Sequence, residues 1–194
     1  MVDLHDIESA RRRIAGSVRR TPILHANALR EKPFLGDLWL KLENLQVSGS
    51  FKARGAINKI LSLTPAQLER GIITASGGNH GVAVAYAGYM TQVPTEVYLP
   101  RNVPPIKIEK LKRWGASLVL EGEVFDDAQN LALEVAAAEG ATYIHPFADT
   151  EIIAGQGTIG LEILEDLPNV DTIIVAIGGG GLIAGIGRAI KALK

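Results

Sequence analysis

A lysine at the start of a predicted helix has the type and position best suited to chemistry in this sequence. Lys52 follows Ser48-Gly49-Ser50-Phe51 and opens a stretch that we interpret as a helix to about Leu63. A cation in the first turn of a helix lies near the positive end of the helix dipole, which disfavours the protonated amine. The neutral amine is the form that Schiff-base chemistry requires. The sequence therefore indicates a lysine nucleophile, with a solvated surface lysine as the alternative.

A second segment suited to chemistry is Ser76-Gly77-Gly78-Asn79-His80-Gly81. It stands between a predicted strand, Ile72–Ala75, and a predicted helix of about His80–Met90. Backbone N–H groups at the start of a helix have no intrahelical partners, so they bind anions. The sequence thus indicates a carboxylate-binding loop. An ordinary strand-to-helix turn rich in Gly and Asn is the alternative, and the presence of Lys52 upstream favours the anion-binding interpretation.

A run of glycines, Gly178-Gly179-Gly180-Gly181, follows an apolar segment and opens another predicted helix, 182–193. A backbone without side chains can wrap closely around a phosphate and offer it both N–H groups and the helix dipole. A flexible hinge is the alternative, but a hinge rarely lies between a buried strand and a helix. The run is not a P-loop, because no Lys-Ser/Thr pair follows it.

The segment Gly155-Gln156-Gly157-Thr158-Ile159-Gly160 matches the dinucleotide pattern G-x-G-x-x-G literally. A dinucleotide fingerprint follows a strand, whereas the preceding residues, Asp149–Ala154, look helical. We therefore interpret this match as a false positive.

Composition excludes several classes of function. The 194 residues carry a net charge of −1, with 21% charged residues, so no nucleic-acid partner is predicted. No metal site is predicted, because the chain has no cysteine and its histidines show no ligand spacing. We interpret His145, beside Pro146, as a packed loop residue. The sequence has no signal peptide and no apolar span of about 18 residues, so we expect a cytoplasmic protein without a membrane partner.

Two predicted helices, 3–18 and 52–63, precede Gly71, and from there onward predicted strands alternate with predicted helices. The strands are expected at 72–75, 95–99, 117–120, 141–144 and 173–177. The helices among them are expected at 80–90, 105–114, 126–139 and 182–193. This alternation predicts an α/β fold, in which a parallel sheet is covered by helices. The apolar runs 72–75 and 173–177 predict strands that are buried on both faces. We expect one domain at 71–144 and another, incomplete at its C-terminus, formed by 1–70 and 145–194.

The segment Ser48–Ala56 resembles the cofactor-lysine segment of the fold type II pyridoxal-phosphate enzymes. The threonine/serine dehydratase branch is the most similar, with serine racemase nearby. The segments 48–56, 76–81 and 178–181 occur in the order of that family, and the likeness begins at Thr21-Pro22. It implies a tryptophan synthase beta-like fold, with a small substrate-binding domain inserted in a larger cofactor domain. It also implies a homo-oligomer and a small amino-acid substrate.

The resemblance assigns roles residue by residue. Lys52 would be the catalytic residue and would hold pyridoxal 5'-phosphate as a Schiff base. The residues expected to contact the cofactor are Phe51, Lys52, Asn79 (at the 3′-oxygen), Gly178, Gly179, Gly180 and Gly181, the glycines forming a phosphate cup. The residues expected to contact the substrate are Ser76, Asn79, His80 and Gln156. A simple core aromatic is the alternative for Phe51.

The reaction implied is β-elimination of L-threonine or L-serine to a 2-oxo acid and ammonia. In serine racemase-like relatives a serine occupies the position of Gly77 and serves as a base; glycine cannot move a proton, so racemisation is disfavoured. Cysteine synthase-like β-replacement stays an alternative, although its lysine and asparagine segments usually read differently. A chain that keeps the fold without activity is another alternative, because the family's partner for the pyridine nitrogen lies beyond residue 194.

Overall fold

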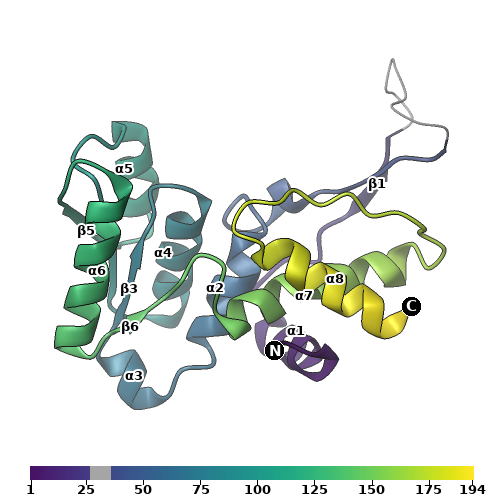
Figure 1. Ribbon diagram of the computed structural model, residues 1–194, viewed down its shortest axis with the longest axis horizontal. Helices are drawn as coiled ribbons and strands as arrows, with labels where there is room; N and C mark the ends of the chain where they lie inside the picture. The colour runs from purple at the N-terminus through teal and green to yellow at the C-terminus, as the bar shows by residue number, and fades with distance from the viewer. Residues whose placement is uncertain (27–35) are drawn as a thin grey trace.

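The computed structural model describes residues 1–26 and 36–194. Figure 1 shows a parallel sheet with its helices on one side of the molecule and a group of helices with a short hairpin on the other. The helix α2 (Lys52–Ile60) lies between these two parts. This arrangement confirms the predicted α/β class.

The parallel sheet has four strands in the order β5-β4-β3-β6. Its strands are β3 (Ile72–Ala75), β4 (Thr95–Leu99), β5 (Ser117–Leu120) and β6 (Thr142–Tyr143). All three pairings are parallel, with Ile72 opposite both Thr95 and Thr142. Parallel neighbours need a crossover. The helices that follow β3, β4 and β5 supply it; they are α4 (Asn79–Thr91), α5 (Pro105–Lys112) and α6 (Phe125–Glu139).

Helices cover both faces of this sheet (Figure 1). On one face, alanines of α6 pack against Ile73 and Tyr98. On the other face, Val97 and Leu99 pack against α4 and α5. Every residue of β3 is buried, which confirms the expectation for a central strand of a parallel sheet.

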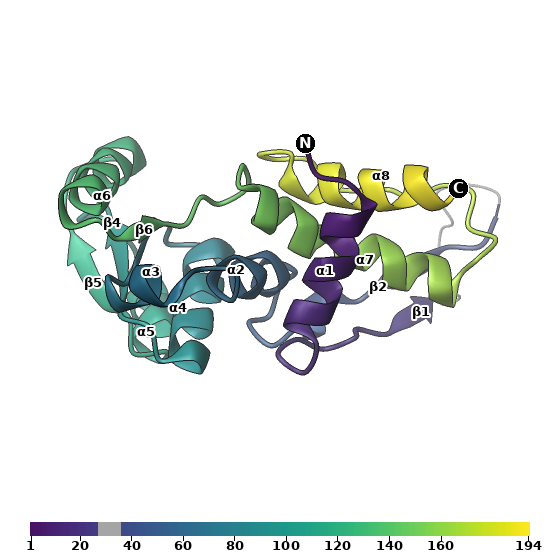
Figure 2. The ribbon, with the colours of Figure 1, turned by 90° about the horizontal axis from the view of Figure 1, so that it is seen from below.

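The other part of the described chain contains three further helices and a hairpin. The helices are α1 (Leu4–Ile14), α7 (Thr150–Asp166) and α8 (Gly181–Leu193), and a 3-10 turn, η1, spans Glu43–Leu45. The short helix α3 (Pro65–Glu69) lies on the side of the parallel sheet (Figure 1). The antiparallel hairpin pairs β1 (Ile23–His25) with β2 (Trp39–Lys41). Figure 2 shows α1 crossing α7, with α8 alongside. Asp3 caps α1 through a capping box with Asp6.

The glycines of the G-x-G-x-x-G segment lie inside α7 and allow helices to approach closely. A Cβ on Gly155 would lie 2.6 Å from the carbonyl oxygen of Arg54 in α2. A Cβ on Gly160 would lie 2.9 Å from Ala189 Cβ in α8. These glycines therefore serve helix packing, which confirms that the dinucleotide match is false.

One predicted strand, 173–177, is wrong. The segment runs from α7 to α8 without pairing to any strand in the described part of the chain, and Ile174 is 79% exposed. It borders a hollow of about 1260 Å³, which β2, α7 and α8 also line. An apolar run becomes a buried strand only where neighbouring strands pair with its backbone groups, and no such neighbour is present here.

Smaller differences concern the ends of helices. We predicted a first helix to Val18 and a lysine helix to Leu63, but α1 ends at Ile14 and α2 at Ile60. In the first case the chain turns through Gly16 with φ +80°, a conformation that favours glycine. No helix among the described residues is both long and apolar enough to cross a membrane.

Candidate active site

Lys52 is the first residue of α2, and its amine is half-buried. Nζ donates a hydrogen bond to the carbonyl oxygen of Pro146 at 2.6 Å and lies 5.3 Å from the centre of the Phe51 ring. Burial lowers the pKa of Lys52 below its ordinary value, because a less hydrated amine holds its proton less well. Burial therefore adds to the effect of the helix dipole, since both favour the neutral form of the amine.

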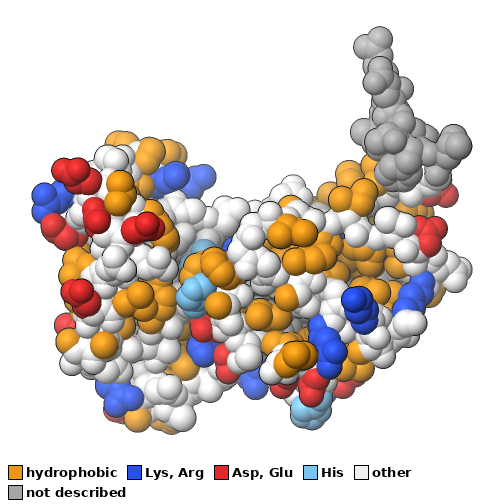
Figure 3. Space-filling model, viewed as in Figure 1, with side chains coloured by type: hydrophobic (Ala, Val, Ile, Leu, Met, Phe, Trp, Pro, Cys, Tyr) orange, Lys and Arg blue, Asp and Glu red, His pale blue; other side chains and the backbone are white. Residues whose placement is uncertain are grey.

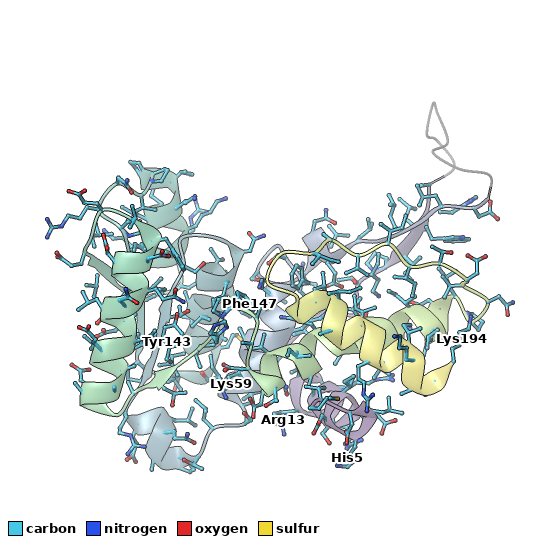
Figure 4. The ribbon with its side chains drawn as sticks, in the orientation of Figure 1. His5, Arg13, Lys59, Tyr143, Phe147 and Lys194 are labelled. Carbon is cyan, nitrogen blue, oxygen red and sulfur yellow. The ribbon has the colours of Figure 1, made fainter. Side chains whose placement is uncertain are left out.

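The segment Ile144–Phe147 joins the segments that the sequence singled out. His80 Nε2 donates to the carbonyl oxygen of Ile144 at 3.1 Å. Lys52 bonds to Pro146 two residues further on. A Cβ on Gly179 would overlap the Phe147 ring. Figure 4 shows Phe147 between the two parts of the molecule, and the space-filling surface is hollowed between them (Figure 3).

Local hydrogen bonds fix the turn at this segment. His145 Nδ1 accepts from the backbone N–H groups of Phe147 at 3.2 Å and Ala148 at 2.9 Å. Asp149 accepts from the backbone N–H of His145 at 3.1 Å. The rings of His145 and Phe147 stack edge to face, with centroids 4.6 Å apart. His145 therefore shapes a loop, in agreement with the interpretation made from the sequence.

The loop 76–81 leaves the end of β3 and starts α4. Gly78 is the N-cap of α4 and offers no side chain to the first N–H groups of the helix. These groups suit a carboxylate. Asn79 is the first residue of the helix and is exposed, whereas Ser76 is half-buried and its Oγ accepts from the N–H of Gly78 at 3.2 Å. A Cβ on Gly81 would overlap the Ser76 carbonyl oxygen, so the shape of the loop requires glycine there.

His80 is buried, with 4% of its surface exposed. Burial lowers its pKa to about 3, so the imidazole is neutral near pH 7. Its Nδ1 has no hydrogen-bond partner among the described residues. The side chain of His80 therefore fixes the start of α4 to the sheet, and its backbone N–H is the group that can face an anion.

The glycine run 178–181 starts α8 with an open backbone. Gly180, the N-cap, has φ +86° and gives the helix no side-chain hydrogen bond. A Cβ on Gly178 or Gly180 would meet nothing within 4 Å. On the other side of the run, a Cβ on Gly181 would lie 2.7 Å from the Phe147 carbonyl oxygen. The run therefore packs against Phe147 on one side and is open on the other.

Two expected site residues lie in the helical core. Gln156 is 1% exposed, and a Cβ on Gly55 would lie 2.5 Å from its amide nitrogen. Its amide nitrogen and oxygen have no hydrogen-bond partner among the described residues. Phe51 is half-buried: it packs against the cluster of Ile159, Ile163 and Ile186 and also lies beside the amine.

The arrangement fits pyridoxal phosphate. A half-buried amine with a lowered pKa suits an aldehyde. The open glycine run at the start of α8 suits a phosphate, and the start of α4 suits a carboxylate. No cluster of three or more His, Asp or Glu side chains among the described residues is placed to hold a metal ion.

The site combines a lysine amine with two helix starts that have no side-chain cap. Such a site suits an α/β enzyme whose ligand reacts with the amine and carries a negative charge. Comparison with known proteins identifies the family. The chain belongs to the family of pyridoxal-phosphate dependent enzymes, whose family model matches residues 14–194.

Individual relatives of this chain include a threonine ammonia-lyase and a threonine dehydratase. An L-threonine ammonia-lyase of Thermotoga maritima is 46% identical over all 194 residues, which cover 48% of that protein. The catabolic L-threonine dehydratase TdcB of Staphylococcus aureus is 45% identical over the whole chain, which covers 56% of it. The chain therefore spans about half the length of the curated relatives it matches.

Solved structures share the fold. Maize serine racemase superposes with a TM-score of 0.92 at 39% identity, covering 99% of this chain and 58% of that one. The processed threonine deaminase isoform 2 of Solanum lycopersicum gives 0.89 at 37% identity, covering 98% and 54%. The fold is that of the type II pyridoxal-phosphate enzymes.

Sequence reasoning missed the segment 144–147 as the place where the site segments meet. We took His145-Pro146 as a domain boundary and His145 as a packed loop residue. The bond from Lys52 goes to a backbone carbonyl, which any residue type offers. The only available signal was its position directly after the last strand of the sheet, where loops of a parallel sheet gather around a ligand.

Proposed function

We propose that this chain forms the lysine-bearing half of a site for pyridoxal-phosphate-dependent β-elimination. L-threonine is the proposed substrate, and L-serine a second one; each would give a 2-oxo acid and ammonia. The observation that carries the proposal is the half-buried Lys52 amine bound to the segment 144–147, which is also contacted by His80 at the start of α4 and by Gly179 before α8. The threonine ammonia-lyase and dehydratase relatives support this choice of substrate.

Each site segment has a proposed task. The bound cofactor would act as a sink for the electron pair left when the substrate α-proton is removed. Lys52, whose pKa is lowered by burial, would hold the cofactor and would take that proton. The Pro146 carbonyl oxygen would then hold the protonated amine. The elimination changes no oxidation state overall, since the water lost from the substrate is returned when ammonia leaves.

The remaining site residues are proposed for binding. Ser76, Asn79 and the backbone of His80 would bind the substrate carboxylate, with Asn79 also near the cofactor. Gly178–Gly181 would hold the phosphate, and Phe51 would lie beside the cofactor ring. We do not extend the proposal to the Gln156 side chain, because it is buried against α2.

Gly77 favours elimination over racemisation. A racemase needs a second proton-moving group on the opposite side of the substrate, and glycine offers none. A Cβ at this position would lie 3.2 Å from both Leu99 and Val103, so a larger residue would also be crowded. The maize serine racemase match therefore supports the fold and not the proposed reaction.

Two coarser parts of the proposal follow from the resemblance. We propose that residues 71–144 form the small domain and that 1–70 with 145–194 belong to the larger one; the sheet of 72–143 supports this division. We also propose a cytoplasmic homo-oligomer, which size measurements in solution would test.

The test is covalent trapping with borohydride. We expect pyridoxal phosphate to give an absorbance band near the visible edge and, after reduction, a peptide modified at Lys52. Lys52→Ala should abolish the modification at that peptide. Lys59→Ala is the matched control, because Lys59 lies in the same helix but is paired with Glu151 at 2.9 Å. Failure of the native chain to form a Lys52 adduct would leave a fold without this chemistry.

A further inference from the structure

Arg54 lies two residues after Lys52 and is completely buried. Its guanidinium binds Glu43 through two hydrogen bonds, Nε to Oε2 at 2.9 Å and Nη2 to Oε1 at 2.8 Å. It binds Glu162 through two more, at 2.6 Å and 2.9 Å. Two bidentate pairs from one side chain are a geometry that only arginine offers. Arg54 thereby ties α2 to both η1 and α7.

The backbone carbonyl oxygen of Arg19 accepts hydrogen bonds from a residue before Lys52 and from a residue after it. Arg54 Nη2 donates to this oxygen at 3.3 Å, and Gln46 Nε2 donates to it at 2.8 Å. The Gln46 amide oxygen in turn accepts from the N–H groups of Arg19 and Val47. The segment that carries Lys52 is therefore fixed on both sides at the same point.

Opposite charges pair around Arg54. Lys41 Nζ lies 2.6 Å from Glu162 and 4.0 Å from the more exposed Asp166, so Arg54 and Lys41 face three carboxylates in a largely buried cluster. A buried cluster of this kind contributes less to stability than its Coulomb attraction suggests, because each ion has lost its hydration. The cluster is better understood as a device that fixes geometry.

The first turn of α2 needs such a device. Its N-cap, Phe51, gives no side-chain hydrogen bond to the helix. Residues two apart on a helix point about 200° away from each other, so Arg54 faces the side opposite Lys52. The amine reaches Pro146 on its own side, and Arg54 holds the same turn from behind.

We propose that Arg54 is a positioning residue for Lys52, which fixes the first turn of α2 so that the amine stays at the Pro146 carbonyl. The inference rests on the proposed function for its catalytic meaning. When Arg54 no longer holds the turn, Lys52 gains hydration. Its pKa then rises toward the ordinary lysine value, because burial is the cause of the lowered value. Lys52 and His145 both interact electrostatically with His80, and none of the hydrogen bonds of Arg54 goes to either histidine.

The experiment compares Arg54→Lys with Arg13→Lys. Arg13 donates to Asn58 at 2.6 Å, so it contacts the far end of the same helix (Figure 4). The reactivity of Lys52 toward acetic anhydride, followed by mass spectrometry over pH without any cofactor, gives the pKa of the amine. For Arg54→Lys we expect the labelling midpoint to rise, so that less neutral amine is present near pH 7 and Lys52 is labelled more slowly. Arg13→Lys should leave the midpoint unchanged.

A second variant separates geometry from charge. Glu43→Gln removes a carboxylate, and the extra net positive charge by itself would lower the Lys52 midpoint. A rise would instead show that the turn has loosened. Glu43→Gln also serves if Arg54→Lys does not fold.

Each outcome decides the inference. An unchanged midpoint in folded Arg54→Lys, an equal rise in Arg13→Lys, or a fall in Glu43→Gln would overturn the positioning role. Borohydride trapping of the native chain reports separately on the proposed function. If the native chain gave no borohydride adduct but its labelling midpoint depended on Arg54, the positioning role would stand and the proposed function would be rejected.

Discussion

At the scale of single residues, burial lowers the pKa of two bases of the site with opposite consequences. The Lys52 amine bonds to one carbonyl oxygen and is half-buried, so it can still reach a ligand. The His80 ring is enclosed and bonds to Ile144, so it can only support the structure. The same physical cause therefore gives a reactive group in one case and a structural group in the other.

His80 makes stability depend on pH. Its pKa is about 3 in the folded chain and near 6.5 when unfolded, so the unfolded state binds the extra proton between these values. The stabilisation is complete above pH 6.5 and declines as the pH falls toward 3. We expect the unfolding free energy to drop by about 1.4 kcal/mol per pH unit in that window from this residue alone.

Urea unfolding of the native chain and His80→Gln at pH 7 and pH 5 tests this. Glutamine keeps an N–H donor for Ile144 but does not titrate. Between pH 7 and pH 5 the unfolding free energy of the native chain should fall by more than that of His80→Gln. An identical pH dependence in both chains would mean that His80 is protonated when folded.

At the scale of elements, two of the three glycines of α8, Gly185 and Gly187, have different environments. A Cβ on Gly185 would overlap the Ile153 carbonyl oxygen and lie 2.6 Å from the backbone nitrogen of Gly157. A Cβ on Gly187 would meet nothing within 4 Å. The first glycine is thus required by the crossing of α7 and α8, and the second is not.

Alanine at these two positions should have opposite effects. Gly185→Ala must separate two helices at their backbones and should lower the unfolding free energy by roughly 2–3 kcal/mol. Gly187→Ala removes backbone freedom from the unfolded chain and should raise it by about 0.5–1 kcal/mol. Denaturant unfolding measures both. Equal effects would show that the α7–α8 crossing is looser than described.

The same elements show what a sequence can and cannot reveal. The strands from Ile72 to Leu120 were predicted because apolar runs and their turns are local signals. The run 173–177 carries the same signal, but pairing depends on distant neighbours, and the prediction was wrong. The hydrogen bonds from Lys52 to Pro146 and from Arg54 to Glu162 span 94 and 108 positions, so no local pattern predicts them.

At the scale of the whole molecule, the segment 172–177 leaves apolar surface open beside the hollow of about 1260 Å³. Ile174 and Ile177 are 79% and 73% exposed. Ile173 and Val175, which alternate with them, pack against the cluster of α7 and α8. Figure 3 shows hydrophobic side chains gathered over this side of the molecule. Exposed apolar surface of this kind favours dye binding and self-association.

Replacing the outward pair should change surface behaviour without changing the fold. For Ile174→Thr with Ile177→Thr we expect weaker binding of an apolar dye and an unfolding free energy within about 0.5 kcal/mol of the native chain, because both side chains lie mostly in water. Val175→Thr is the matched control. It places a hydroxyl against the packed cluster and should cost roughly 1 kcal/mol. If the double variant lost that much stability while dye binding stayed the same, the outward side chains would be packed, and the apolar surface would lie elsewhere on the molecule.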